Sequence, residues 1–297
     1  MGMVIRIGQV IRQACAITAI AFAAALLSCS RPKVVPLKIG LLPGESAPTV
    51  LRLNEPLRAF LEQELGRPVE LVVGANYAAT GEALRFGRID VAYLGPVTYI
   101  LQGHHAKLEP IARPSHANVG PTFQAVIIVP VDSPVRSLAD LGGKSIAFGD
   151  PASTSGTWVP RHELLDAGLA AGRDYTKVVL GAHDAVARAV AGHKVDAGGL
   201  SMPIYRRLIG EKVIDPSTVR VLAESQPIPE YMWTVRQGLE PNLRERLRSA
   251  LLSVKDPRAL AVFRATAFVE ARDGDVDIVR RWVEQVRAAT PEEFSAL

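Results

Sequence analysis

Three consecutive hydroxyl residues, Ser153-Thr154-Ser155, precede Gly156 and lie between a predicted strand and a predicted helix. The unpaired N–H groups and the dipole at a helix start attract anions. Hydroxyls at the same place can donate to the oxygens of a tetrahedral oxyanion, and Gly156 allows close backbone approach. Alternatively, Ser155 or Thr157 is only the helix N-cap within a polar loop. The segment lacks the Gly-Lys-Ser/Thr ending of a nucleotide P-loop.

Two further segments place polar or aromatic groups after strands. Gly95-Pro96 follows the predicted strand 91–94, and ligands of open α/β sheets bind at such carboxyl ends. On spacing alone, Tyr93 fits core packing and Tyr99 a helix face. His183 stands between a strand and a helix, where a lone histidine is more often an N-terminal helix residue than a ligand-binding group.

The elements that must position these residues alternate along the chain. Apolar runs predict strands at 37–42, 69–73, 91–94, 125–129, 145–148, 178–180 and 219–222. Helical spacing predicts helices near 57–65, 82–87, 157–167, 184–192 and 202–209, and from Pro241 almost to the end. This alternation predicts two α/β lobes with open, largely parallel sheets covered by helices.

Composition limits the function classes. The chain has 297 residues, of which 48% are hydrophobic and 22% charged, so a packed core is expected. Its 34 Lys and Arg against 30 Asp and Glu give a charge of +4, too weak to indicate nucleic-acid binding. Both cysteines, Cys15 and Cys29, lie near the N-terminus, so the body has no disulfide framework, zinc knuckle or thiol nucleophile.

The N-terminus has the pattern of an export signal. Residues 1–28 contain two arginines, no acidic residue and an apolar run shorter than the ~20 residues that span a bilayer. The run ends in Leu-Leu-Ser before Cys29, which resembles the lipobox of bacterial lipoproteins and implies lipidation of that cysteine. An ordinary signal peptide with an incidental Cys29 is the alternative. Residues 29–36 are expected to be a tether, and removal of the signal lowers the formal charge to +2.

Three motifs, taken together, resemble one family. Residues 93–96 (YLGP), 150–156 (DPASTSG) and 183–198 (HDAVARAVAGHKVDAG) are similar, in order and spacing, to signatures of the phosphate/phosphite/phosphonate substrate-binding proteins of ABC transporters. The resemblance covers about residues 37–285. It implies an α/β, type II periplasmic-binding-protein fold, whose two lobes are joined by two hinge crossings. We expect lobe 1 at 37–123 plus 223–297 and lobe 2 at 124–222.

The resemblance also implies a set of ligand-binding residues. Those carried over position by position are Ser153, Thr154, Ser155, Gly156, His183, Tyr93, Tyr99, Tyr77 and Glu230. Glu230 stands in Pro227-Ile228-Pro229-Glu230-Tyr231, where the family tends to have aspartate, and Gln124 also departs from the family pattern. Glu230 can accept a proton-bearing P–OH, fix the His183 tautomer or contact an amine. The ligand's identity stays open.

We therefore expect an exported, monomeric, periplasmic lipoprotein anchored through Cys29. It would capture a small phosphorus oxyanion (phosphonate, phosphite or phosphate) for an ABC permease, with no catalytic residue, cofactor, metal or nucleic acid. A sensor that reports to a membrane receptor is an alternative. A hydrolase is less favoured, because no Gly-x-Ser-x-Gly elbow is present and His183 and Asp184 point apart.

Several other residues receive structural interpretations. His104, His105 and His116 are expected to be solvated loop histidines, because they lack the helical spacing of a metal-binding pair. Tyr231 and Trp233 are expected to pack in the core or hinge.

Overall fold

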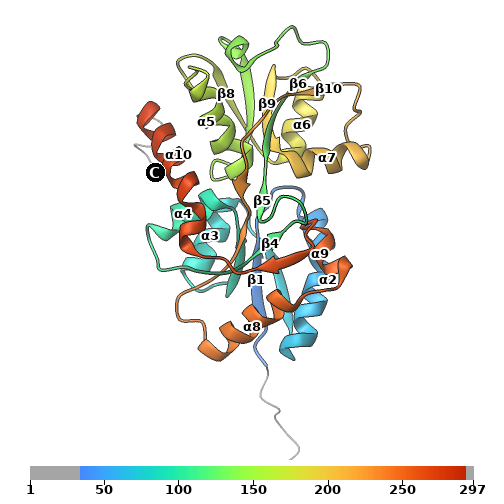
Figure 1. Ribbon diagram of the computed structural model, residues 1–297, viewed down its shortest axis with the longest axis vertical. Helices are drawn as coiled ribbons and strands as arrows, with labels where there is room; N and C mark the ends of the chain where they lie inside the picture. The colour runs from blue at the N-terminus through green and yellow to red at the C-terminus, as the bar shows by residue number, and fades with distance from the viewer. Residues whose placement is uncertain (1–33, 292–297) are drawn as a thin grey trace, which may run out of the picture. The chain divides into compact units, whose positions relative to one another are not determined.

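The computed structural model describes residues 34–291, and from Pro36 onward the chain forms one compact unit with two main sheets (Figure 1). The first sheet has the strand order β13-β4-β12-β3-β1-β2. Its strands are β1 (Leu37–Leu41), β2 (Val69–Val73), β3 (Val91–Leu94), β4 (Glu109–Ser115), β12 (Met232–Val235) and β13 (Ala267–Val269). Helices α2 (Ala47–Leu65), α3 (Tyr77–Arg85), α4 (Pro96–Gly103), α8 (Pro241–Ser253) and α9 (Pro257–Ala261) belong to the same lobe.

The second sheet has the order β10-β6-β9-β7-β8. Its strands are β6 (Ala125–Pro130), β7 (Ser145–Gly149), β8 (Thr176–Gly181), β9 (Ala197–Ser201) and β10 (Val219–Glu224). Helices α5 (Val159–Asp166), α6 (His183–Ala191) and α7 (Met202–Gly210) and the short turn η1 (Leu138–Leu141) accompany it. Every residue of β6 and of β9 is buried, so the centre of this sheet is covered on both faces.

Both sheets are mixed, and the expectation of largely parallel sheets is wrong. In the first sheet, β1 runs parallel to β2 and β3, but β12 is antiparallel to β3 and β4. In the second, β6 is antiparallel to β9 and β10. The cause is the hinge. A strand that enters a sheet directly from the other lobe starts at the edge that faces that lobe, which is where the strands of the βαβ units end. It therefore runs antiparallel to them.

The hinge is a short two-stranded ladder between the sheets. β5 (Thr122–Phe123) pairs antiparallel with β11 (Ile228–Pro229), in the register Phe123 with Ile228. β5 leads into β6, and β11 follows β10, so the two hinge crossings lie side by side (Figure 1). This is the type II arrangement of two α/β lobes that the sequence motifs implied.

The predicted strands are all present, with shifts of a few residues at their ends. Strands β4, β9, β12 and β13 were not expected. The helix expected at 157–167 begins earlier, as a π-helical turn η2 (Thr154–Trp158) that continues into α5. The stretch expected to be helical from Pro241 is divided: Asp256-Pro257 separates α8 from α9, and the strand β13 and the turn η3 (Asp273–Val276) precede the last helix.

The last helix, α10 (Asp277–Ala289), packs against both lobes. It buries Val279, Trp282, Val283 and Val286 in a cluster that also contains residues of α4 and α5. Polar contacts support the α5 side: the Arg161 guanidinium donates to Thr290 Oγ1 at 3.0 Å, and a ring nitrogen of His162 lies 2.9 Å from Gln285 Oε1. The C-terminal helix therefore ties the lobes together on the flank where it lies (Figure 1).

Candidate functional site

The hydroxyl triplet lies where β7 ends and η2 begins. All three side chains are fully buried. The Ser153 Oγ accepts the Gly156 N–H at 3.1 Å, so this serine is the N-cap. The Trp158 N–H bonds to the Ser153 carbonyl at 3.1 Å, which sets the wide π-helical turn. Such turns are frequent at functional sites, and this one presents the triplet at the amino end of the helix.

The loop before the triplet contacts the first lobe directly. The Val97 N–H donates to Thr154 Oγ1 at 2.9 Å, and Thr98 Oγ1 donates to the Ala152 carbonyl at 3.0 Å. The Tyr77 N–H donates to Asp150 Oδ2 at 3.0 Å. The structure thus describes a closed arrangement, in which Thr154 accepts a hydrogen bond from the amino end of α4 in the other lobe.

Ser155 differs from its two neighbours. Its Oγ is buried and makes no well-formed hydrogen bond within residues 34–291, although the Tyr231 hydroxyl lies close enough to act on it. A buried hydroxyl without a full hydrogen bond loses about 1–3 kcal/mol of solvation, which makes Ser155 Oγ a candidate ligand contact. Two tyrosine hydroxyls lie near the triplet: Tyr231 beside Ser155, and Tyr77 beside Ser153 and Tyr231. Burial raises the pKa of Tyr231 to about 12 and raises that of Tyr77, so both hydroxyls keep their protons.

His183 opens α6 and is almost completely buried, with 2% of its surface exposed. Its Nδ1 accepts the Ser201 N–H at 3.3 Å, so the proton of the neutral ring is on Nε2. Burial lowers the pKa of His183 to about 4, which keeps the ring neutral at pH 7. Among the described residues Nε2 has no recorded partner, and it is therefore available to donate to a ligand oxygen. Ser201, rather than Glu230, fixes the tautomer.

Three glycines allow close packing around the site, and two of them face the other lobe: a Cβ on Gly95 would lie 3.1 Å from Thr154 Oγ1, and a Cβ on Gly44 would lie 3.6 Å from His183 Cδ2. A Cβ on Gly156 would lie 2.9 Å from His183 Cε1, and a Cβ on Gly44 would lie 3.0 Å from the Tyr77 hydroxyl. A Cβ on Gly95 would lie 2.9 Å from Tyr231 Cζ. The His183 N–H also donates to the Gly44 carbonyl at 3.1 Å. Glycine is therefore needed for close contact at each position, including Gly156, for which the sequence suggested such a role.

A second cluster surrounds Glu230, whose exposed fraction is 6%. His116 Nε2 lies 2.9 Å from Glu230 Oε1, and the Tyr231 N–H donates to Oε2 at 3.0 Å. The Tyr93 hydroxyl lies beside the same carboxylate, and the Tyr93 ring stacks on Tyr231 and Trp233. The interpretation of His116 as a solvated loop histidine is wrong, because its ring is held by Glu230. The hydrogen bond to Glu230 raises the pKa of His116.

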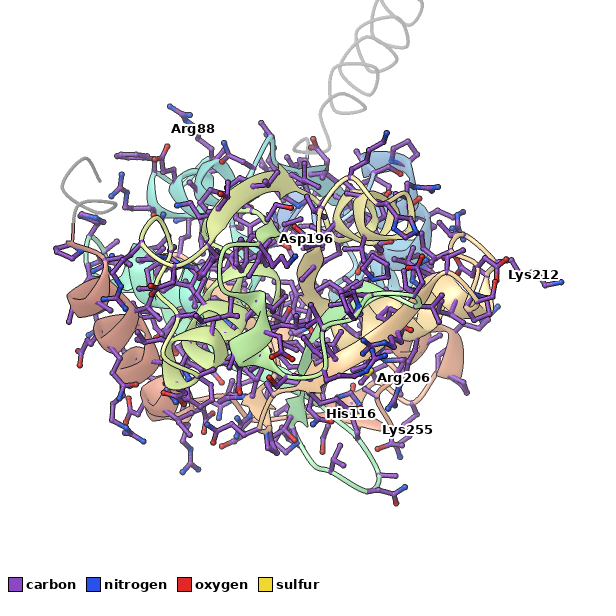
Figure 2. The ribbon with its side chains drawn as sticks, turned by 90° about the horizontal axis from the view of Figure 1, so that it is seen from above. Arg88, His116, Asp196, Arg206, Lys212 and Lys255 are labelled. Carbon is purple, nitrogen blue, oxygen red and sulfur yellow. The ribbon has the colours of Figure 1, made fainter. Side chains whose placement is uncertain are left out.

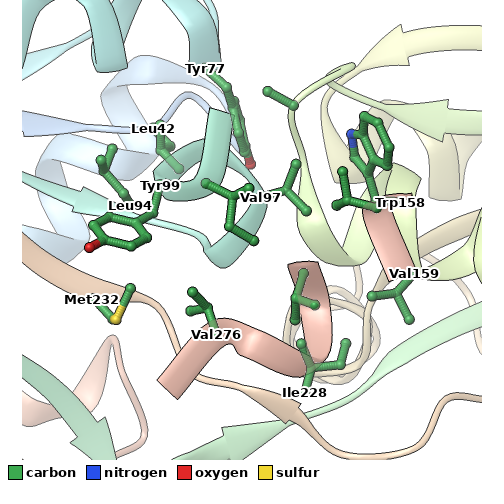
Figure 3. Close-up of a cluster of buried hydrophobic side chains, with 14 of the residues drawn as sticks. Leu42, Tyr77, Leu94, Val97, Tyr99, Trp158, Val159, Ile228, Met232 and Val276 are labelled. Atoms are coloured by element: carbon green, nitrogen blue, oxygen red, sulfur yellow. The ribbon is translucent and has the colours of Figure 1, made fainter. Parts of the chain in front are cut away.

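Tyr99 lies apart from the other candidate residues. Its hydroxyl donates to Asp273 Oδ1 at 2.7 Å, and its ring is directed away from Tyr77 (Figure 3). Burial and this acceptor raise the pKa of Tyr99. The structure therefore brings together the triplet, Gly156, His183, Tyr77, Tyr93 and Glu230, and places the Tyr99 hydroxyl in the packing around η3. Tyr231, which sequence reasoning assigned to packing, joins the site; its position directly after Glu230 was the available signal.

Comparison with known proteins identifies the type of site. Residues 39–276 match the family of ABC transporter, phosphonate, periplasmic substrate-binding proteins. This chain belongs to that family. The membership agrees with the expectation of a substrate-binding protein rather than an enzyme, and the hydrolase alternative is not retained.

Individual relatives of the binding protein are distant. It is 26% identical to the phosphate-import protein PhnD of Mycolicibacterium smegmatis, over 71% of this chain and 69% of that protein. It is 25% identical to the phosphonates-binding periplasmic protein of Escherichia coli, over 82% and 74% of the two chains. Prochlorococcus marinus PhnD1, solved with methylphosphonate, matches with a TM-score of 0.78 at 20% identity, over 84% of this chain and 98% of that one. This structural match shows the shared fold.

The described part of the binding protein lacks two features, a membrane-spanning helix and a cluster of metal ligands. Within residues 34–291, no helix is long and apolar enough to cross a bilayer. The same residues contain no group of three or more His, Cys, Asp or Glu side chains that could hold a metal ion. The predicted signal peptide, Cys29 and most of the tether lie outside the described residues.

Acidification is expected to destabilise the protein through His183. Because burial lowers the pKa of this ring from 6.5 to about 4, the unfolded chain binds the proton at higher pH than the folded chain does. The contribution of the neutral His183 ring to the free energy of unfolding is therefore complete above pH 6.5. It decreases by about 3 kcal/mol as the pH falls toward 4. In urea unfolding, the difference between wild type and His183→Gln should shrink by that amount between pH 7 and 4. A difference in the free energy of unfolding between the two proteins that does not change with pH would contradict the lowered pKa of His183.

Proposed function

We propose that the protein captures a small phosphorus oxyanion (phosphonate, phosphite or phosphate) between its two lobes and delivers it to an ABC permease. The observation that supports the proposal is the buried Ser155 Oγ at the start of η2, with the His183 ring at the start of α6 close by, 2.9 Å from where a Cβ on Gly156 would lie. Hydroxyls, helix N–H groups and a neutral imidazole replace the water that an oxyanion loses on entry. None of these donors adds a charge to the site.

The ligand is expected to stabilise the closed state, because it contacts donors from both lobes. Tyr77 comes from the lobe of the first sheet, and the triplet and His183 come from the lobe of the second. Bound ligand then increases the population of the closed conformation, which the permease can recognise. The lobe boundaries in this proposal are 37–123 plus 223–297 and 124–222, and the working unit is a monomer.

A panel of ligands tests the proposal. Phosphite, phosphate, hypophosphite, methylphosphonate and 2-aminoethylphosphonate are each added to the purified mature protein, with sulfate as a tetrahedral control. At a hundredfold excess over its Kd, a true ligand should add about 2.7 kcal/mol of stability, seen as a thermal shift. If no phosphorus oxyanion of the panel shifts the melting temperature, the proposal is wrong.

We also propose that lipid on Cys29 anchors the protein to the membrane on its extracytoplasmic side. The support is the Leu-Leu-Ser-Cys pattern at the end of the apolar run. A Cys29→Ser variant should be absent from the membrane fraction of expressing cells, whereas a Cys15→Ser control should be found in that fraction. Retention of Cys29→Ser in the membrane fraction would count against the anchor.

A further inference from the structure

The carboxylate of Glu230 is already engaged on both oxygens. His116 Nε2 lies 2.9 Å from Oε1, and the Tyr231 N–H donates to Oε2 at 3.0 Å. The Tyr93 hydroxyl lies beside the same group. Through these contacts Glu230 holds the backbone of Tyr231, which lies beside Ser155, and the hydroxyl of Tyr93, whose ring packs on Tyr231.

The charge of Glu230 is also balanced within the protein. His116 Nδ1 lies 3.1 Å from the Arg264 carbonyl oxygen, which can only accept, so Nδ1 carries a proton. Whichever of Glu230 and His116 Nε2 holds the next proton, the pair has no net charge. The Arg264 guanidinium adds a positive charge close to this pair.

Further cations lie near Arg264. Arg206 and Arg207 of α7 are close enough to Arg264 to act on it electrostatically. Arg207 is itself paired with Glu45 and Glu211. In the top view, His116 and Arg206 lie on the same side of the molecule, away from Arg88 (Figure 2). The surroundings of Glu230 therefore carry an excess of positive charge.

An ammonium group that entered here would lose its hydration and meet a carboxylate whose charge is already neutralised, with Arg264 nearby. Such a cation would be poorly compensated. An oxyanion, in contrast, is not repelled by Glu230, because the charge of this residue is balanced. We infer that Glu230 is a positioning residue for Tyr93 and Tyr231, and that the site accepts phosphorus oxyanions without a cationic substituent. This inference rests on the proposed function.

An isosteric ligand pair tests the inference. Ethylphosphonate and aminomethylphosphonate have the same number of heavy atoms. The first carries a methyl group at the position where the second carries an ammonium group. Calorimetric titration of the wild-type protein at pH 7 should show ethylphosphonate binding at least tenfold more tightly. If aminomethylphosphonate binds as tightly or more tightly, the inference is wrong while the proposed function stands. If no phosphorus oxyanion binds at all, the proposed function itself fails.

A variant separates the charge of His116 from its hydrogen bond. His116→Gln keeps a donor toward Glu230 but cannot supply the proton that balances the carboxylate, so the ethyl-to-aminomethyl affinity ratio should fall at least threefold. The control His104→Gln replaces an exposed histidine and should leave the ratio unchanged. A purely structural role for His116 would weaken both ligands equally and keep the ratio at its wild-type value, which would overturn the inference.

Discussion

Ser155→Ala should weaken phosphorus-oxyanion binding by about 10- to 150-fold without lowering the stability of the ligand-free protein. A hydrogen bond to a charged group contributes about 1.5–3 kcal/mol, and among the described residues the Ser155 Oγ makes no well-formed hydrogen bond that the substitution would remove. Removal of this buried hydroxyl should leave the melting temperature of the apo protein equal or higher. Calorimetric titration and thermal unfolding measure the two effects separately.

Two serine variants serve as controls. Ser153→Ala removes the acceptor of the Gly156 N–H and should cost the apo protein about 1 kcal/mol. Ser145→Ala removes a bond to Asp196 at the opposite end of β7 and should leave affinity unchanged. If Ser155→Ala bound the ligand as tightly as wild type, the oxyanion position would lie elsewhere.

Gly95→Ala should also reduce affinity strongly, because it opposes closure. In the closed arrangement the added Cβ would lie 3.1 Å from Thr154 Oγ1 of the other lobe and 2.9 Å from Tyr231 Cζ of its own lobe, and such overpacking costs about 1–3 kcal/mol. The φ of Gly95 is −68°, which suits alanine, so the effect comes from contact rather than from backbone strain. We expect about 5- to 150-fold weaker binding, with the apo protein shifted toward an open form.

Small-angle scattering provides the second readout. The radius of gyration of Gly95→Ala should be larger than that of wild type and should decrease only at high ligand concentration. Gly103→Ala, at the other end of α4, meets no atom within 4 Å and serves as the matched control. Equal affinity for Gly95→Ala and Gly103→Ala would show that closure tolerates the added methyl.

Much of the fold was predictable from the sequence, because its local signals agree. Apolar runs followed by Gly or Pro marked strands such as β1 and β6, and the three motifs together implied two lobes. The strand β9 was missed, because Ala-Gly-Gly-Leu-Ser has little strand propensity. Its glycines are required by packing: a Cβ on Gly199 would lie 2.7 Å from Pro160 Cγ, and one on Gly198 would lie 2.5 Å from Val186 Cγ1. Such neighbours are not visible in a local sequence pattern.

The site was predictable as far as the anion-binding loop. The triplet could be placed at a helix start, because a strand and a helix flank it. The partners of Glu230 could not be predicted, because His116 lies 114 positions away in the sequence and reaches the carboxylate only through the hinge region. The position of Tyr99 was also inaccessible, since its acceptor Asp273 lies 174 positions further on.

The helix α10 restricts the way in which the lobes can separate. Its buried side chains pack against α4 and α5 on one flank, whereas Glu45 and Arg207 join the lobes near α7 on the other flank (Figure 1). Translation of the lobes apart would expose the apolar surface of α10 to water. Rotation about an axis along the α10 flank exposes far less, and it breaks the ion pair at the other flank together with cross-lobe hydrogen bonds such as that of the His183 N–H to the Gly44 carbonyl. We therefore expect a ligand to enter and leave on the Arg207 side, so that a partner could distinguish the two states by the width of that gap.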